Sequence, residues 1–231
     1  MRQITGAGAR RLQNESLAGD DMSQLPISDL DLAALLCSRV CHDVISPVGA
    51  IGNGLELFDD PETDEDTRQT ALSMIRTSAR TAAAKLMFCR IAFGAAGSAG
   101  AFIDLSEAGE MAKGFIASEK VKLDWQAPPE NRPKQQVKLL LNMLLMAIAG
   151  VPRGGLITVT AEGDTLLARA RGERAKVPEP LAQVLDGTAD LNVLDARLVQ
   201  PYYAKLLAHS AGLALTMAMD GEDVLVKASP V

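Results

Sequence analysis

The sequence predicts an antiparallel helical hairpin that pairs with a second copy as a dimeric four-helix bundle, followed by an α/β sandwich. Apolar residues recur at helical spacing in two long segments joined by an acidic turn at residues 59–64. A Gly-, Ala- and Ser-rich run then leads into a second half in which helix-like and strand-like segments alternate. The expected parts are a flexible tail (1–26), the hairpin domain (27–94), a linker (95–101) and the sandwich domain (102–231).

Composition excludes several classes of protein. The 231 residues are 48% hydrophobic and only 3% aromatic, and the net charge is −6. No long basic run is present, so we expect no nucleic-acid partner. The first residues lack the apolar core of a signal peptide, and the apolar stretch 139–151 is too short to span a bilayer, so we expect a cytoplasmic protein without a membrane partner. The three cysteines are expected to be reduced and buried, with no metal site.

The first helix is expected to begin at a capping box. Ser28 is the predicted N-cap, Asp31 lies three residues later, and helical periodicity continues to Phe58. Pro47 inside the helix removes one backbone donor and predicts a kink. The predicted apolar face consists of Leu36, Val40, Val44, Val48 or Ile51, and Leu55.

The second helix is expected over residues 64–93. Its predicted buried face consists of Leu72, Ile75, Ala79, Ala82, Leu86 and Phe93. Two helices of this length, each about 45 Å long, cannot bury both apolar faces in a lone hairpin. Pairing of two hairpins would bury them, so we expect a homodimer.

The second half predicts helices on one face of a mixed or antiparallel sheet. Strands are expected at 102–105, 121–126, 156–161, 165–170, 213–219 and 224–228, and helices at 106–117, 134–150, 180–185 and 196–210. Trp125 is expected to lie in the core, and His209 is expected to be structural.

His42 is the candidate catalytic residue. It lies about 200° around the helix from Val44, so its imidazole should face away from the apolar face. A neutral exposed imidazole is a competent nucleophile, and Asp43 could orient it or accept a proton from it. A lone histidine on a helix is usually a surface residue without a role, but the acidic neighbour and the proline five residues later favour a functional one. The candidate partner-binding residues are Arg39, Ile45, Ser46, Gly49 and Asn53, with Pro47 structural at the site.

These residues carry a resemblance to a known family. Residues 30–93 resemble the dimerisation and phosphotransfer domain of histidine kinases, whose hallmark is His-Glu/Asp-x-x-x-Pro. The string from Leu32 to Leu55 resembles the ChpT family of alphaproteobacterial histidine phosphotransferases more closely, and the likeness extends over residues 28–230. The resemblance implies a second domain of degenerate histidine-kinase, Bergerat-like fold.

The second half departs from an active kinase at its nucleotide determinants. The segment at Asn142 resembles the kinase N-box, but Met146 stands where a second, magnesium-binding Asn is expected, and a thioether is a poor ligand for that ion. Residues 171–175 lack the Asp-x-Gly-x-Gly pattern, and no Gly-rich lid follows. Arg197, Gln200 and Tyr203 look like residues of the family instead. We therefore expect no ATP, no cofactor and no metal on this chain, with Mg²⁺ held by the partner.

The resemblance implies a multistep phosphorelay in cell-cycle regulation. A receiver aspartate of a CckA-like hybrid histidine kinase would phosphorylate His42, which would pass the group to response regulators similar to CtrA and CpdR. Two alternatives stay open from the sequence. One is a non-catalytic dimeric adaptor that binds response regulators, and the other is an unorthodox histidine kinase that uses ATP.

Overall fold

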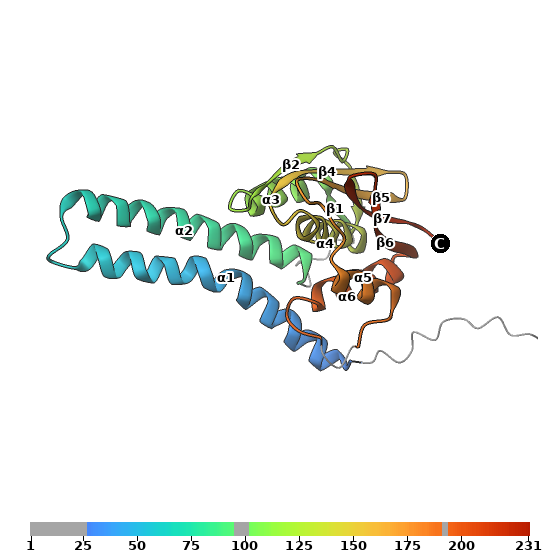
Figure 1. The fold of residues 1–231 in the computed structure, drawn as a ribbon, viewed down its shortest axis with the longest axis horizontal. Helices are drawn as coiled ribbons and strands as arrows, with labels where there is room; N and C mark the ends of the chain where they lie inside the picture. The colour runs from blue at the N-terminus through green and yellow to red at the C-terminus, as the bar shows by residue number, and fades with distance from the viewer. Residues whose placement is uncertain (1–26, 95–101, 191–193) are drawn as a thin grey trace, which may run out of the picture.

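Two long antiparallel helices project from an α/β part in the computed structural model (Figure 1). They are α1 (Asp29–Asp59) and α2 (Glu65–Ala92). The structure describes residues 27–94, 102–190 and 194–231. The predicted tail (1–26) and linker (95–101) therefore lie outside the described residues.

Both helices of the hairpin begin at side-chain caps. The Ser28 hydroxyl accepts a hydrogen bond from the Asp31 backbone N–H at 3.1 Å and donates to the Asp31 carboxylate at 2.6 Å. The Asp64 carboxylate accepts from the Thr67 backbone N–H at 2.8 Å, and this contact lowers the pKa of Asp64. These caps satisfy N–H groups that have no partner within the helix. The predicted start of the first helix is confirmed.

Helix α1 continues through Pro47, and Figure 1 shows that it bends near its middle. A proline inside a helix removes one backbone hydrogen bond and crowds the preceding turn, which accounts for the bend. His42 and Asp43 lie in the turns just before Pro47. The bend is therefore adjacent to the candidate site.

The α/β part contains a five-stranded mixed sheet with the strand order β2-β4-β5-β7-β6, in which only β2 and β4 pair in parallel. The strands of this sheet are β2 (Val121–Trp125), β4 (Gly155–Glu162), β5 (Thr165–Arg171), β6 (Leu213–Asp220) and β7 (Asp223–Pro230). A two-stranded sheet pairs β1 (Phe102–Asp104) with β3 (Asn131–Pro133). The helices are α3 (Leu105–Ile116), α4 (Lys134–Gly150), α5 (Glu179–Asp186) and α6 (Val199–Ser210).

Alternate residues of β4, β5 and β7 are buried, so one face of the sheet meets helices and the other is more exposed. Helix α4 supplies much of the core, because eleven of its residues are buried. The predicted order of helices and strands is confirmed, with two differences. The three-residue strand β3 was not predicted, because it is short and ends in proline. Helix α6 begins at Val199 rather than 196, since the Asp195 carboxylate accepts from the backbone N–H groups of Arg197 and Leu198 in a preceding turn.

The base of the hairpin shares its core with the α/β part. Phe88, Ile91 and Ala92 of α2 are buried in the same hydrophobic cluster as α3, α4 and the sheet. The Phe88 ring stacks on Phe115 of α3, with centroids 4.3 Å apart. On the predicted buried face of α2, Ala79 and Leu86 are exposed in this single chain, Leu86 to 49%, because the face that meets the α/β part is a different one. Their burial by a second copy stays a prediction.

Of the three cysteines predicted to be buried, Cys89 is buried, whereas Cys37 and Cys41 are exposed on α1 of this single chain. The predicted burial of Cys37 and Cys41 stays a prediction that depends on a second copy. By length and composition alone, α1 could cross a membrane, with a mean hydropathy of 1.3 over its most apolar window. One such helix is a weak indication, since helices that pack in soluble proteins meet the same criterion.

Candidate functional site

His42 presents its imidazole to solvent from the middle of α1. Its side chain is 60% exposed, whereas Pro47, on the opposite side of the helix five residues later, is buried. Successive residues of a helix are about 100° apart, so His42 lies about 140° around α1 from the buried Pro47. His42 therefore points away from the interior of its own hairpin. The imidazole is therefore accessible to an incoming reactant.

Asp43 divides its carboxylate between two neighbours. Its Oδ1 lies 3.4 Å from Nδ1 of His42, and its Oδ2 accepts a hydrogen bond from Nε of Arg39 at 2.9 Å. The Asp43 side chain is only 12% exposed and that of Arg39 is 20% exposed. When Nδ1 carries the ring proton and donates to Oδ1, the lone pair of Nε2 is free to attack an electrophile.

The buried thiol of Cys89 on α2 lies near charged side chains of both helices: Asp43 and Arg39 of α1, and Lys85 of α2. Burial raises the pKa of Cys89 on α2 to about 11; the charge of Asp43 adds to the rise, while Arg39 and Lys85 oppose it. Lys85 in turn pairs with Glu119 of the α/β part, with 3.1 Å between Nζ and Oε1. The carboxylate beside His42 thus lies in a region where α1, α2 and the α/β part meet.

The structure also places the other candidate partner-binding residues. Ile45 is 69% exposed, and Ser46 and Asn53 are exposed. No atom lies within 4 Å of a Cβ built on Gly49, so the backbone there is open. Arg39 differs from the rest, because its Nε is held by Asp43 within the chain. The four-residue spacing of this pair was the sequence signal that could have revealed it.

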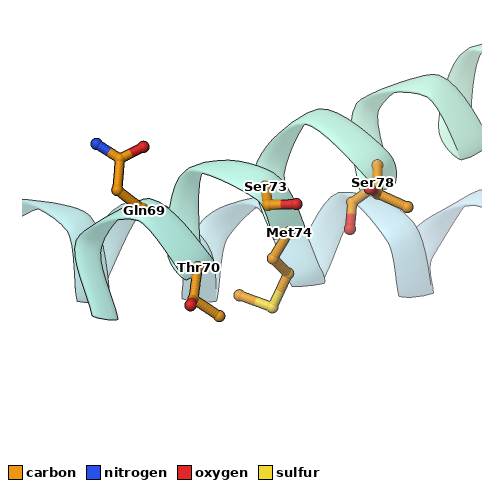
Figure 2. Close-up of a pocket in the computed structure, with 6 residues that line it drawn as sticks. Gln69, Thr70, Ser73, Met74 and Ser78 are labelled. Carbon is orange, nitrogen blue, oxygen red and sulfur yellow. The ribbon is translucent and has the colours of Figure 1, made fainter. Parts of the chain in front are cut away.

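A shallow hollow of about 540 Å³ lies along α2, beyond the part that contacts the α/β domain. Figure 2 shows Thr70, Ser73 and Ser78 on this side of the helix, with Met74 between them. Small side chains leave the helix backbone approachable here. The Met74 Cε lies 3.1 Å from a Cβ built on Gly54 of α1, so the hollow borders the hairpin interface about 18 Å along the axis from His42.

A different face of the hairpin is apolar and uncovered. The exposed large side chains on it include Val48 (51%), Leu55 (45%) and Leu86 (49%), and Cys37 and Cys41 are exposed beside them. Val48 and Leu55 lie roughly 120° to 140° around α1 from His42. A hollow of about 360 Å³ opens there, lined by Leu36, Cys37, Val40, Leu86, Cys89, Arg90, Phe93 and Gly94.

Asn142 has a structural role that the sequence did not predict. Its buried amide Nδ2 donates to the backbone carbonyls of Ala92 at 3.0 Å and of Lys138 at 2.8 Å. The amide of Gln200 on α6 donates to both the side-chain and the backbone oxygen of Asn142 at 3.0 Å. Asn142 therefore ties the end of α2 to α4 and α6.

Met146 and Tyr203, two residues of the segments where an active kinase would bind nucleotide, are both engaged within the chain. Met146, one turn after Asn142, is fully buried in the core. Tyr203, which looks like a family residue, accepts a hydrogen bond from Nζ of Lys138 at 3.0 Å and packs near Phe93. Among the described residues, no group of three His, Cys, Asp or Glu side chains lies close enough to hold a metal ion.

Comparison with known proteins agrees with this geometry. Residues 105–223 match the family described as the histidine phosphotransferase C-terminal domain. The chain is 46% identical over 206 residues to the protein phosphotransferase ChpT of Brucella abortus (strain 2308), covering 87% of this chain and 97% of that protein.

A solved structure is also similar along most of the chain. A bacterial phosphotransferase solved at 1.7 Å superposes with a TM-score of 0.80 at 42% identity, covering 89% of this chain and 98% of the other. The cytoplasmic segment of the histidine kinase QseC aligns with a TM-score of 0.37 at 18% identity, over 57% of this chain and 77% of the other. The predicted helical hairpin followed by an α/β domain and the predicted phosphotransferase activity are both confirmed. The chain belongs to the ChpT family of histidine phosphotransferases.

Proposed function

We propose that the chain acts in a multistep phosphorelay, in which His42 accepts a phosphoryl group from a receiver aspartate and passes it to the receiver aspartates of response regulators. The single observation that carries this proposal is the imidazole of His42, 60% exposed on α1 and adjacent to the Asp43 carboxylate. A nucleophile at a solvent-facing position on a rigid helix can reach an aspartyl phosphate held on the surface of another protein.

The chemistry follows from the two ring nitrogens. Nε2 of His42 attacks phosphorus as the bond between phosphorus and the donor aspartate oxygen breaks, and the donor retains the electron pair as a carboxylate. The positive charge that develops on the ring is stabilised through the Nδ1–H group and the Asp43 carboxylate. The reverse reaction with a second receiver regenerates the free imidazole. Such transfers depend mainly on positioning, so a preformed His–Asp pair lowers the cost of reaching the reactive arrangement.

The exposed surface around His42 is suited to a protein partner. Ile45 offers apolar area, Gly49 leaves the backbone open, and Ser46 and Asn53 offer polar groups on neighbouring turns. A domain of about 100 residues has a radius of gyration near 13 Å, so a docked receiver could extend from His42 to the hollow on α2. The expected partners are the receiver of a CckA-like hybrid kinase and regulators similar to CtrA and CpdR, in the cytoplasm.

We also propose that the chain is a homodimer. The apolar face that includes Val48, Leu55 and Leu86 is exposed in one chain, and its burial would stabilise the association of two hairpins. Because this face lies away from His42, a second copy can cover it and leave the imidazole free. The pairing would also bury Cys37 and Cys41, as the sequence predicted.

No nucleotide or metal enters the proposed mechanism on this chain. The amide of Asn142 is already engaged by Ala92, Lys138 and Gln200, and the Met146 side chain lies in the core. Neither residue is therefore available for a magnesium–nucleotide complex. The Mg²⁺ needed for transfer would be held by the acidic pocket of the receiver.

The test is transfer from a phosphorylated receiver domain to wild type, to His42→Ala and to His209→Ala. His209 is the matched control, because it is the other of the two histidines and is also exposed on a helix, at the end of α6. We expect His42→Ala to lose acid-labile labelling completely while its dimer, measured by light scattering, persists. We expect His209→Ala to be labelled like the wild type.

The same experiment separates the two alternatives. An adaptor would bind the receiver equally well with His42→Ala, and no phosphohistidine would form on any variant. An unorthodox kinase would label His42 from ATP alone, without a donor protein. Labelling of His42→Ala by the phosphorylated receiver would reject the relay through His42.

A further inference from the structure

We infer that Arg39 is a positioning residue for phosphoryl transfer, which acts on His42 through Asp43 and not through contact with the partner protein. This inference rests on the proposed role of His42. Asp43 contacts two side chains of α1, one a turn earlier and one adjacent in sequence: Nε of Arg39 donates to Oδ2 of Asp43 at 2.9 Å, and Oδ1 of Asp43 lies 3.4 Å from Nδ1 of His42.

The exposure of the three side chains changes along this arrangement. Arg39 is 20% exposed, Asp43 is 12% exposed and His42 is 60% exposed. The acceptor group is thus open to a partner, while the two groups behind it are largely covered by the protein. An ion pair that is partly removed from water holds its geometry better than one on the open surface, because solvent screens it less.

The order of the pair along the helix argues against a purely structural role. An acidic residue four positions before a basic one stabilises a helix more than the reverse order, and here the basic residue comes first. Arg39 and Asp43 also lie in the middle of a 31-residue helix, where no capping is needed. Orienting the Asp43 carboxylate toward His42 is a role for this ion pair that helix stability alone does not provide.

The chemical consequence concerns which ring nitrogen carries the proton. With Oδ2 held by Arg39, the carboxylate is oriented so that its Oδ1 faces Nδ1 of His42. An ionised carboxylate only accepts hydrogen bonds, so it favours the tautomer with the proton on Nδ1 and leaves the Nε2 lone pair for phosphorus. Without Arg39, the carboxylate can rotate away from the ring.

Other titratable groups face the same region and do not replace Arg39. Lys85 of α2 is held by Glu119 of the α/β part and lies over the Phe115 ring. Cys89 of α2 stays a neutral thiol at ordinary pH, because burial raises its pKa. Of these groups, Arg39 makes the direct contact with Asp43.

The test uses the full chain with two phosphoryl donors: a phosphorylated receiver domain and phosphoramidate, a small molecule that needs no docking surface. Phosphoramidate transfers its phosphoryl group to Nε2 as its P–N bond breaks and ammonia leaves. We expect Arg39→Met to slow formation of phosphohistidine at His42 on the order of tenfold with both donors. Arg39→Lys, which keeps a cation, should recover most of the rate. The ¹⁵N chemical shifts of the His42 ring should show loss of the Nδ1–H tautomer in Arg39→Met, and should show that tautomer in the wild type and in Arg39→Lys.

A double-mutant cycle completes the test. If Arg39 acts through Asp43, Arg39→Met should cause no further loss in an Asp43→Asn background. The inference is overturned if Arg39→Met slows only the receiver-dependent reaction, which would make Arg39 a docking residue. It is also overturned if the two losses multiply, or if Arg39→Met matches the wild type in rate and tautomer. Failure of the wild type to form phosphohistidine with either donor would instead reject the proposed function.

Discussion

Asn142 offers a sharp test of how the hairpin is held to the α/β part. Its side chain is fully buried, and its Nδ2 supplies the hydrogen bond to the carbonyl of Ala92, at the last residue of α2. The last carbonyls of a helix have no partner within the helix. Asn142→Ala therefore leaves the buried oxygen of Ala92 without this donor and removes the side-chain acceptor of Gln200.

The magnitude follows from these contacts. A buried carbonyl that loses its partner costs about 1–3 kcal/mol, and the hydrogen bond lost by Gln200 costs about 1 kcal/mol. Gln200 retains the backbone oxygen of residue 142, which limits the second contribution. We expect the free energy of unfolding to fall by about 3 kcal/mol in Asn142→Ala, or roughly 6–12 °C in Tm for a chain of this size.

An isosteric variant separates hydrogen bonding from packing. Asn142→Asp preserves the shape of the side chain but places an oxygen where Nδ2 now lies, 3.0 Å and 2.8 Å from the carbonyl oxygens of Ala92 and Lys138. We expect Asn142→Asp to lose more stability than Asn142→Ala at pH 7, because a buried charge then faces two acceptors. Asn53→Ala, at an exposed position of α1, is the control and should stay within about 0.5 kcal/mol of the wild type.

The assay is urea unfolding followed by circular dichroism, at one protein concentration because association contributes to stability. A loss below about 0.5 kcal/mol in Asn142→Ala, or an Asn142→Asp variant more stable than Asn142→Ala, would refute the reasoning. Either result would mean that the amide is not what joins the two parts.

Three further predictions concern the α/β part and the buried thiol. Gly109→Val should destabilise the protein by about 1–3 kcal/mol and shift the fluorescence of the single tryptophan, because a Cβ at residue 109 lies 2.8 Å from the Trp125 ring. Gly114→Ala is the control and should change neither property, because a Cβ at residue 114 has one contact, at 3.8 Å. Hydrogen bonds from Arg171 and Arg169 of β5 hold the pKa of Asp223 below its usual value of 3.8. The stabilisation of the folded state by these ion pairs is therefore fully present above pH 3.8 and is lost as pH falls through the folded-state pKa of Asp223. Asp223→Asn should therefore be less stable at pH 7 and lose less stability on acidification, measured by urea unfolding at both pH values. Burial raises the pKa of Cys89 to about 11, so its thiol should be unreactive at pH 8 in the folded protein. In a variant with the other two cysteines replaced by serine, iodoacetamide should label Cys89 at pH 8 only after unfolding, and mass spectrometry measures the label.

The local elements could be predicted from the sequence because each depends on residues close together in the chain. The Ser28 capping box, the proline in α1 and the hairpin at residues 162–164 produced the expected starts, bend and turn. The exposure of His42 also followed from its angle to the apolar face. The short strand β3 escaped prediction, because its pairing with β1 spans about thirty residues and leaves no local periodicity.

The choice of neighbour for each helix face could not be predicted in the same way. The periodicity of α2 indicated one apolar face, but Phe88 and Ile91 belong to another face that meets the α/β part. A helical pattern shows that a face is apolar and does not show what covers it. Leu86 fitted the predicted face and is exposed in this chain for the same reason.

The sequence by itself determined the two-part architecture, the ends of the two hairpin helices and the solvent-facing position of His42, because these depend on short-range spacing and on side-chain chemistry. The tertiary structure alone decided that Asn142 joins α2 to α4 and α6, and that Lys85 pairs with Glu119. These contacts join residues 34 to 58 positions apart. Their geometry depends on how the helices pack, and packing is fixed by the burial of the whole core.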